Sequence, residues 1–211
     1  DLRKVYKNCL EKLTEYSTEV SQNSALCEAY KKLAARDDFH NLSESQRKSI
    51  ENILRDFRLG GVDLPEDKKK RYAELSRELA ELSNKFSDNV LDATQHWYKH
   101  ITDVDELSGL PETAIEGARQ AARQKELDGY VITLDFPSFY PVMTYGDNRS
   151  LRREVYEAFV TRASDQGPDA AKWDNTPVMA EILKRRHALA QLLGFDNYAE
   201  RSLATKMARS V

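Results

Sequence analysis

Residues 147–198 read DNRSLRREVYEAFVTRASDQGPDAAKWDNTPVMAEILKRRHALAQLLGFDNY, and this stretch predicts two amphipathic helices joined by a polar loop. In the first helix, a cap at Asp147 or Asn148 precedes apolar residues at helical spacing. The second helix has a strong start signal, because the Asn-Thr-Pro at 175–177 combines a capping side chain with an early proline. Gly194 ends that helix. The stretch therefore favours a helical fold.

The composition of the 211 residues fits a soluble, helix-rich protein. Hydrophobic residues make up 40% and charged residues 32%, which is typical of a folded chain and not of a disordered one. The net charge is −3 and the basic residues are interspersed with acids, which argues against nucleic acid as a partner. No apolar run reaches the roughly 20 residues that a membrane span needs. Nothing resembles a signal peptide, so we expect a cytoplasmic protein with no membrane partner.

Toward the N-terminus, apolar residues recur every three or four positions in three segments, which predicts three amphipathic helices. The first covers residues 2–20, and a shorter helix follows it. The third opens at Ser43, with Gln46 in the position of a capping box. It ends at Gly60, because glycine accepts the left-handed conformation that terminates helices.

The longest predicted element covers about residues 65–100. Pro65 suits a first helical position, and the acidic Glu66 and Asp67 complement the positive end of the helix dipole. A helix of about 34 residues would span roughly 50 Å, so it is either one strand of a coiled coil or the spine of a larger helical body. We favour the spine, because the apolar side chains along it are aromatic and irregular in size.

The character of the chain changes after the Asp-Gly turn at 128–129. A helix with an Ala-rich face starts at Pro111 and precedes this turn. Residues 130–134 form a β-branched run, and a proline-punctuated turn separates it from a second short run at 142–145. These runs predict a small β hairpin at about residues 130–145. An isolated hairpin is marginal in water, so it must lie against the helices, and its exposed edge could receive an extended peptide.

The expected fold is therefore mainly α: an elongated multi-helix body with one long spine helix at about 65–100 and one small β hairpin at about 130–145. We find no fixed-period repeat and no low-complexity linker, so residues 1–211 are expected to form a single helical region. Cys9 and Cys27 lie on neighbouring predicted helices. A disulfide is one alternative, and buried thiols in a reducing compartment are the favoured one.

One pair of histidines has the spacing of a metal site. His96 and His100 are four residues apart, which would place both imidazoles on one helical face, as in zinc helices. In the metalloprotease version the residue after the first histidine is a glutamate that acts as general base, and here that residue is Trp97. Only Asp103 or Asp105 offers a third ligand. We therefore expect no metal site and no catalytic residue among the residues of this chain.

Several unusual strings carry a resemblance to a known family. They are RDFRLGGVDL (55–64), LSNKFSDNV (82–90), DNRSLRREVYEAFVTRASDQGP (147–168) and WDNTPVMAEILKRRHALAQLLGFDNYAERSLATKMA (173–208). Together they make the chain resemble, over essentially its whole length, the thimet-oligopeptidase family of zinc metallopeptidases and its bacterial oligopeptidase A branch in particular.

The resemblance implies a much longer, mostly helical parent protein with two lobes around a deep, narrow channel. A zinc ion at the floor of the channel cleaves peptide bonds in short peptides, and folded proteins are excluded. The zinc is held by an HExxH motif and a downstream glutamate. No histidine of this chain is followed by a glutamate; the four are His40, His96, His100 and His187.

This sequence is accordingly expected to be an N-terminal to middle fragment that is inactive alone and binds no zinc. The chain starts at Asp1 without a methionine and stops inside KMARSV, which agrees with that expectation. Its partners would be short peptides and the missing catalytic lobe, and its helices would form a channel wall. Tyr140 and Tyr145 are the candidates for residues that face the substrate channel. Surfaces that face the missing lobe should be apolar and exposed, which would cause self-association.

Two other hypotheses stay open. The chain could be a free-standing, non-catalytic helical interaction module that uses the same fold. It could also be a small metal-binding helical protein built on His96 and His100.

Overall fold

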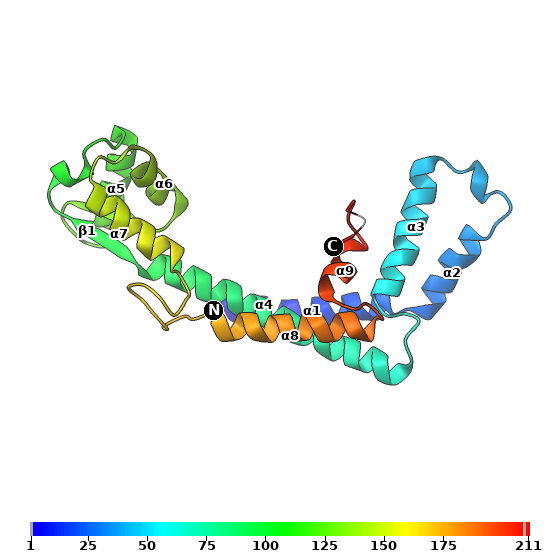
Figure 1. The fold of residues 1–211 in the computed structure, drawn as a ribbon. Coiled ribbons are helices and arrows are strands. Elements are labelled where there is room, and N and C mark those ends of the chain that lie inside the picture. The colour runs from blue at the N-terminus through cyan, green and yellow to red at the C-terminus, as the bar shows by residue number, and fades with distance from the viewer. Residues whose placement is uncertain (1, 209) are drawn as a thin grey trace. The chain divides into compact units, whose positions relative to one another are not determined.

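The computed structural model describes residues 2–208 and 210–211, and over these residues the chain is mainly helical (Figure 1). Its internal contacts divide the chain into two compact units. Unit 1 contains the chain up to Ser83 and the chain from Glu181 onward, and unit 2 contains Asn84–Ala180. The expected mainly α fold with one small antiparallel sheet is confirmed, whereas the single helical region stays a prediction. None of the described helices is long and apolar enough to cross a membrane.

Three helices open unit 1, and their starts follow from local capping. They are α1 (Leu2–Ser21), α2 (Ser24–Ala34) and α3 (Glu44–Leu59), with a 3-10 turn at Phe39–Asn41. The predicted capping box at α3 is present: Ser43 Oγ accepts from the Gln46 N–H, and Gln46 Oε1 accepts from the Ser43 N–H. The predicted end of α3 is confirmed as well, because Gly60 caps the helix and the following Gly61 has a φ of +81°.

The long helix α4 (Glu66–His96) confirms the predicted long element but ends one turn earlier than predicted. The sequence placed residues up to about 100 in the helix. The structure instead places Tyr98–Ile101 in strand β1, which pairs with a second strand of unit 2. Pairing with a distant strand therefore overrides the helical pattern at the end of α4.

Two small apolar clusters hold unit 1 together. The first joins α2 and α3 through Cys27, Phe57 and Val62. The second joins α4 to α8 (Thr176–Leu192) and contains Tyr72, Leu75 and Leu189. An ion pair between Arg185 Nε and Glu78 at 2.8 Å connects the same two helices. The last helix of the described chain is α9 (Tyr198–Leu203).

The sheet of unit 2 corrects the predicted hairpin. β1 pairs antiparallel with β2 (Tyr130–Thr133), in the register Tyr98↔Thr133 to Ile101↔Tyr130. The second predicted strand, 142–145, belongs instead to helix α6 (Phe136–Tyr145), which starts after Asp135 with a proline in its first turn. The true partner of β2 lies about thirty residues earlier, so no local turn signal could identify it.

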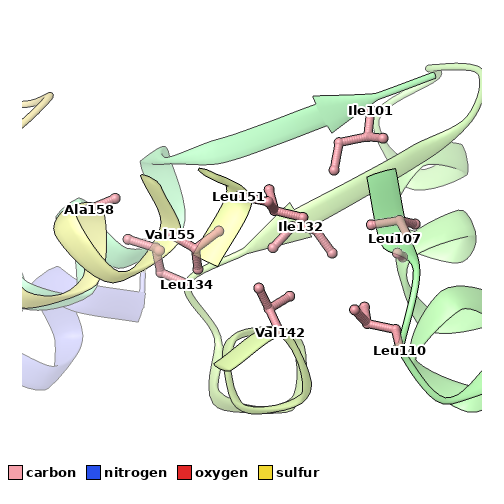
Figure 2. Packing of buried hydrophobic residues seen from close by; sticks show 10 residues of the cluster. Ile101, Leu107, Leu110, Ile132, Leu134, Val142, Leu151, Val155 and Ala158 are labelled. Carbon is pink, nitrogen blue, oxygen red and sulfur yellow. The ribbon is translucent and has the colours of Figure 1, made fainter. Parts of the chain in front are cut away.

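The core of unit 2 forms between this sheet and the helices α5 (Glu112–Gln124), α6 and α7 (Arg149–Val160). Figure 2 shows β-branched and leucine side chains from the two strands, from α6 and α7 and from the adjoining segments pointing toward one another. The fully buried members include Ile101, Leu107, Ile132, Leu134, Val142 and Val155. The Ala-rich face of α5 faces this core, because Ala118 is 4% exposed and Ala122 is 0% exposed.

The buried Asn175 holds the start of α8 against α4 within unit 2. Its side chain donates to the Phe86 carbonyl at 3.1 Å and accepts from Asn89 Nδ2 at 2.9 Å. Its backbone N–H donates to the Ala163 carbonyl at 2.9 Å. The residue is only 2% exposed, so these bonds satisfy a polar group that would otherwise be costly to bury.

Candidate functional site

The two predicted channel tyrosines both lie on α6 and are half exposed. Tyr140 is 48% exposed, and its ring stacks on Phe136 at a centroid distance of 5.2 Å. Tyr145 is 51% exposed. Tyr145 lies five positions after Tyr140 on the α-helix, which turns their side chains roughly 140° apart. The structure therefore presents two separate aromatic contacts, and their role in a channel stays a prediction.

A close backbone approach positions Tyr145 at the end of α6. The Asp147 N–H donates to the Ser108 carbonyl at 2.8 Å, which ties the end of α6 to the preceding loop. Gly109 in that loop has a φ of +85°, and a Cβ there would collide with the Tyr145 carbonyl. Only glycine accepts this conformation and this distance without strain. The position of Tyr145 therefore depends on a glycine that is distant in sequence.

The strand edge that the sequence offered to an extended peptide falls on β2, where one backbone donor is already engaged, and addition of a peptide there stays a prediction. Val131 and Ile132 are 0% and 1% exposed. The Thr133 N–H donates to the Ser138 hydroxyl at 2.9 Å, which occupies a donor that an added strand would need. Small side chains let α5 pack directly against β2. What remains beside them is a groove of about 360 Å³ lined in part by Gly117.

The two histidines with zinc-helix spacing do not share a helical face, so the geometry assumed for that spacing is wrong. His96 is the last residue of α4, and His100 lies on β1. His96 Nε2 is 3.0 Å from Lys172 Nζ and 3.5 Å from an Asp169 carboxylate oxygen. His100 Nε2 is 2.6 Å from the Asp128 carbonyl oxygen.

These partners do not fit a zinc site. A lysine ammonium beside Nε2 of His96 would repel a cation, and His100 is engaged elsewhere. Within residues 2–208 and 210–211, no three side chains of the histidine, cysteine, aspartate or glutamate type converge. A zinc site normally needs at least three such ligands.

Sequence reasoning missed Arg162, a charged side chain packed against aromatic rings. Its Cζ lies 3.7 Å from the centre of the Phe159 ring, which stacks on Phe139. Its Nε donates to the Phe159 carbonyl at 2.8 Å, and its Nη1 donates to the Thr94 hydroxyl at 3.2 Å. Burial lowers the pKa of the Arg162 guanidinium, because desolvation disfavours the charged form. In the sequence Arg162 stands among polar residues, a pattern that predicts a solvated side chain. The sequence therefore contains no signal that Arg162 packs on an aromatic ring.

The cysteines are separate thiols. Cys27 is buried between α2 and α3, and Cys9 is exposed on α1. The favoured interpretation of free thiols is confirmed, but burial holds only for Cys27. Burial raises the pKa of the Cys27 thiol above its ordinary value, which keeps it protonated and unreactive.

One face of α1 presents an exposed row of large apolar side chains in unit 1, and we call it the α1 face. It consists of large hydrophobic residues at helical spacing, and no residue of α1 is buried. The members, each more than half exposed, are Leu2, Val5, Tyr6, Leu13 and Tyr16. An exposed apolar face of this length is typical of a surface that another protein segment covers.

Comparisons with known proteins match this chain from end to end. A profile of the Neurolysin/Thimet oligopeptidase N-terminal domain matches residues 1–69, and a profile of Peptidase family M3 matches residues 142–211. The chain is 55% identical to oligopeptidase A of Salmonella typhimurium and 54% identical to oligopeptidase A of Escherichia coli, each over 210 residues. A probable cytosolic oligopeptidase A of Arabidopsis thaliana is 38% identical over 215 residues.

These alignments cover 99–100% of this chain but only 30–31% of each relative. The chain therefore spans about a third of the length of the curated relatives that it matches. The two profiles cover its two ends, and the identity extends through the segment between them. By these matches, the chain belongs to the thimet-oligopeptidase family.

Proposed function

We propose that this chain is part of a cytoplasmic, zinc-dependent oligopeptidase that hydrolyses peptide bonds in short peptides. The observation that carries the proposal is the 55% identity to a bacterial oligopeptidase A across the full length of the chain. Identity at this level along the whole chain supports the same structural role for this chain and for the aligned third of the relative. The chain supplies structure to the enzyme, and the zinc and the groups that act on the peptide lie outside residues 1–211.

In this proposal the helices of the chain form one wall of a channel that limits substrate size. Tyr140 and Tyr145 are the residues expected to face the channel, because each presents a half-exposed ring. An exposed tyrosine can pack its ring on an apolar substrate side chain and hydrogen-bond through its hydroxyl. Such contacts would contribute to substrate binding without taking part in bond cleavage.

The α1 face is the proposed contact with the catalytic lobe. Its exposed rings and leucines would remain in water unless a further part of the protein covered them. Burial of apolar surface contributes about 25 cal/mol per Å², so an interface along this helix would be stabilising. The occupant that agrees with the family membership is the two thirds of an oligopeptidase that this chain does not include.

A chimera tests the proposal directly. The aligned segment of Escherichia coli oligopeptidase A is replaced by this chain, and the zinc-loaded product is assayed with a quenched fluorescent peptide of about ten residues. We expect hydrolysis by the chimera and none by the isolated chain supplied with zinc. A chimera that is folded by circular dichroism and contains zinc, yet does not cleave the peptide, would contradict the proposed role. So would cleavage by the isolated chain that His96→Ala abolishes.

The same chimera tests the channel wall. Tyr140→Ala should raise KM for short peptides while kcat changes little, because the ring contributes to binding in the ground state and in the transition state alike. Tyr98→Ala removes another half-exposed tyrosine of unit 2 and serves as the matched control. If the two substitutions changed KM and kcat equally, the proposal that Tyr140 faces the channel would be contradicted.

A non-catalytic interaction module is the second candidate, and the exposed α1 face is the observation that favours it. The reading frame after Val211 discriminates between the two. An HExxH motif within the next few hundred codons supports the peptidase. A stop codon directly after Val211 supports the module.

A further inference from the structure

A pocket of about 530 Å³ lies within unit 1 beside the α1 face, with which it shares Leu13. Four helices line it: α1, α3, α4 and α9. Its apolar wall includes Leu10, Leu59 and Tyr72. Two charged residues, Asp56 and Arg201, lie at the same pocket. A mostly apolar pocket with a few polar groups is the usual form of a binding site for a small organic molecule.

Arg201 is the unusual member of this lining. Its Nε is buried and has no hydrogen-bond partner. The Tyr198 ring lies 5.6 Å from its Cζ and 5.1 Å from the Cζ of Arg186, so two guanidinium groups share one aromatic ring. No carboxylate of the described chain lies within ion-pair distance of either arginine. A guanidinium in this state lacks the acid that normally balances a partly buried arginine.

Hydroxyl groups supply further donors at the pocket. Ser17 from α1 and Ser76 from α4 both line it, and neither hydroxyl forms a hydrogen bond with another described group. The hydroxyls of Thr14, Thr18 and Ser21, which also line the pocket, donate to backbone carbonyls of α1. The donors of the pocket that form no hydrogen bond with another described group therefore include Arg201 Nε and the hydroxyls of Ser17 and Ser76.

The acid at the pocket has its own partner. Asp56 Oδ1 accepts from Nε and Nη2 of the neighbouring Arg55 at 2.9 and 2.8 Å, so its charge is balanced locally. One unbalanced guanidinium and two hydroxyls match a singly charged acceptor with two oxygen atoms. A carboxylate has this form, and arginine binds it through paired hydrogen bonds.

We propose that this pocket binds the terminal carboxylate of a short peptide, with Arg201 as the charged partner and Ser17 and Ser76 as hydroxyl donors. The peptide side chains pack on the apolar wall formed by Leu10, Leu59 and Tyr72. A rotation of the Arg201 side chain toward the ligand gives its Nε the acceptor that it lacks. Binding of this kind needs no catalysis, so the inference stands even if the proposed function fails.

The test measures binding of three probes to the 211-residue chain by NMR titration of 15N-labelled protein. The probes are N-acetyl-leucyl-leucine with a free carboxylate, the same dipeptide as its C-terminal amide, and N-acetyl-leucyl-glutamate with its α-carboxyl group amidated. We expect the free acid to bind about tenfold more tightly than the amide, as for the gain of one charge-assisted hydrogen-bond pair. The glutamate probe separates a side-chain carboxylate from a terminal one.

Variants assign the effect to Arg201. Arg201→Gln removes the charge and should cost the free acid about tenfold in affinity, whereas Arg201→Lys should retain part of the binding. Ser76→Ala should weaken binding less than Arg201→Gln. Arg149→Gln removes an exposed charge in unit 2 and should leave the affinity unchanged.

The outcomes are distinct. If the chain prefers the free acid to the amide and Arg201→Gln abolishes this preference, the proposal is supported. If the glutamate probe binds as tightly as the free acid, the pocket recognises a side-chain carboxylate equally well, and the assignment to a terminal carboxylate is overturned. Equal binding of acid and amide by the unsubstituted chain would overturn the proposal, and this comparison does not depend on any variant. The proposal would also be overturned if none of the three probes, at a high concentration, changed the NMR chemical shifts of the residues that line the pocket.

Discussion

At the scale of single residues, the buried polar side chains define this protein more sharply than its apolar ones do. Asn175 is held by Asn89 and by the Phe86 carbonyl. Each of these bonds links residues more than 80 positions apart. Arg201, in contrast, has a buried nitrogen without a partner. Satisfied groups of this type specify one packing arrangement, whereas an unsatisfied group marks a place where a ligand or partner can be gained.

Asn175→Ala should lower the free energy of unfolding by about 1–3 kcal/mol, because it removes two hydrogen bonds and leaves the part-buried Asn89 amide without its acceptor. The measurement is urea unfolding followed by circular dichroism. Asn8→Ala, at an exposed position of α1, is the control and should change stability by less than about 0.5 kcal/mol. Equal effects of the two substitutions would show that Asn175 does not anchor α8.

At the scale of elements, helix starts are the best-predicted features of the chain. Ser43 and Gln46 form the expected capping box, and α8 begins at Thr176 as its Asn-Thr-Pro signal indicates. Capping depends on residues within one turn, so local sequence is sufficient to predict it. The end of α4 was predicted too late because a strand pair between β1 and β2 decides it.

Asp174 makes the start of α8 sensitive to pH. Hydrogen bonds from the Thr176 side chain and backbone lower the pKa of this carboxyl, and the Thr176 N–H lies 2.8 Å from its Oδ1. A carboxyl with a lowered folded-state pKa stabilises the fold above its unfolded value of about 3.9. That contribution is lost as the pH falls through the folded-state pKa.

Asp174→Asn should therefore destabilise the chain at neutral pH, and the difference from the unsubstituted chain should vanish in acid, where both side chains are uncharged. Urea unfolding at a series of pH values measures this difference. Asp174→Ala loses the hydrogen bond as well as the charge, so it should remain less stable at every pH. A difference for Asp174→Asn that does not change with pH would contradict the role of the charge.

At the scale of the whole molecule, the chain carries apolar surface that its own fold does not bury. Tyr6 and Tyr16 are 57% and 64% exposed on the α1 face. We expect the purified chain to bind an apolar dye such as ANS and to self-associate as its concentration rises. Sedimentation velocity over a concentration series measures the association.

The double substitution Tyr6→Lys with Tyr16→Lys should reduce dye binding and self-association while changing the free energy of unfolding by less than about 0.5 kcal/mol, because neither ring is packed. Glu11→Gln with Glu15→Gln changes the charge by the same amount on other positions of α1 and serves as the control. An unsubstituted chain that stays monomeric and binds no dye would contradict the interpretation of the α1 face as a docking surface.

The amino-acid sequence by itself determined helices such as α3, α7 and α8, the caps that start them, and the family. These features depend on neighbouring residues or on strings such as WDNTPVMAEILKRRH (173–187), which can be read without coordinates. Only the tertiary structure decided which segment pairs with β2, that His96 and His100 occupy different elements, and that Arg201 Nε is buried without a hydrogen-bond partner. Each of these depends on contacts between residues far apart in the chain, and the free energy of such contacts outweighs local preference where the two disagree.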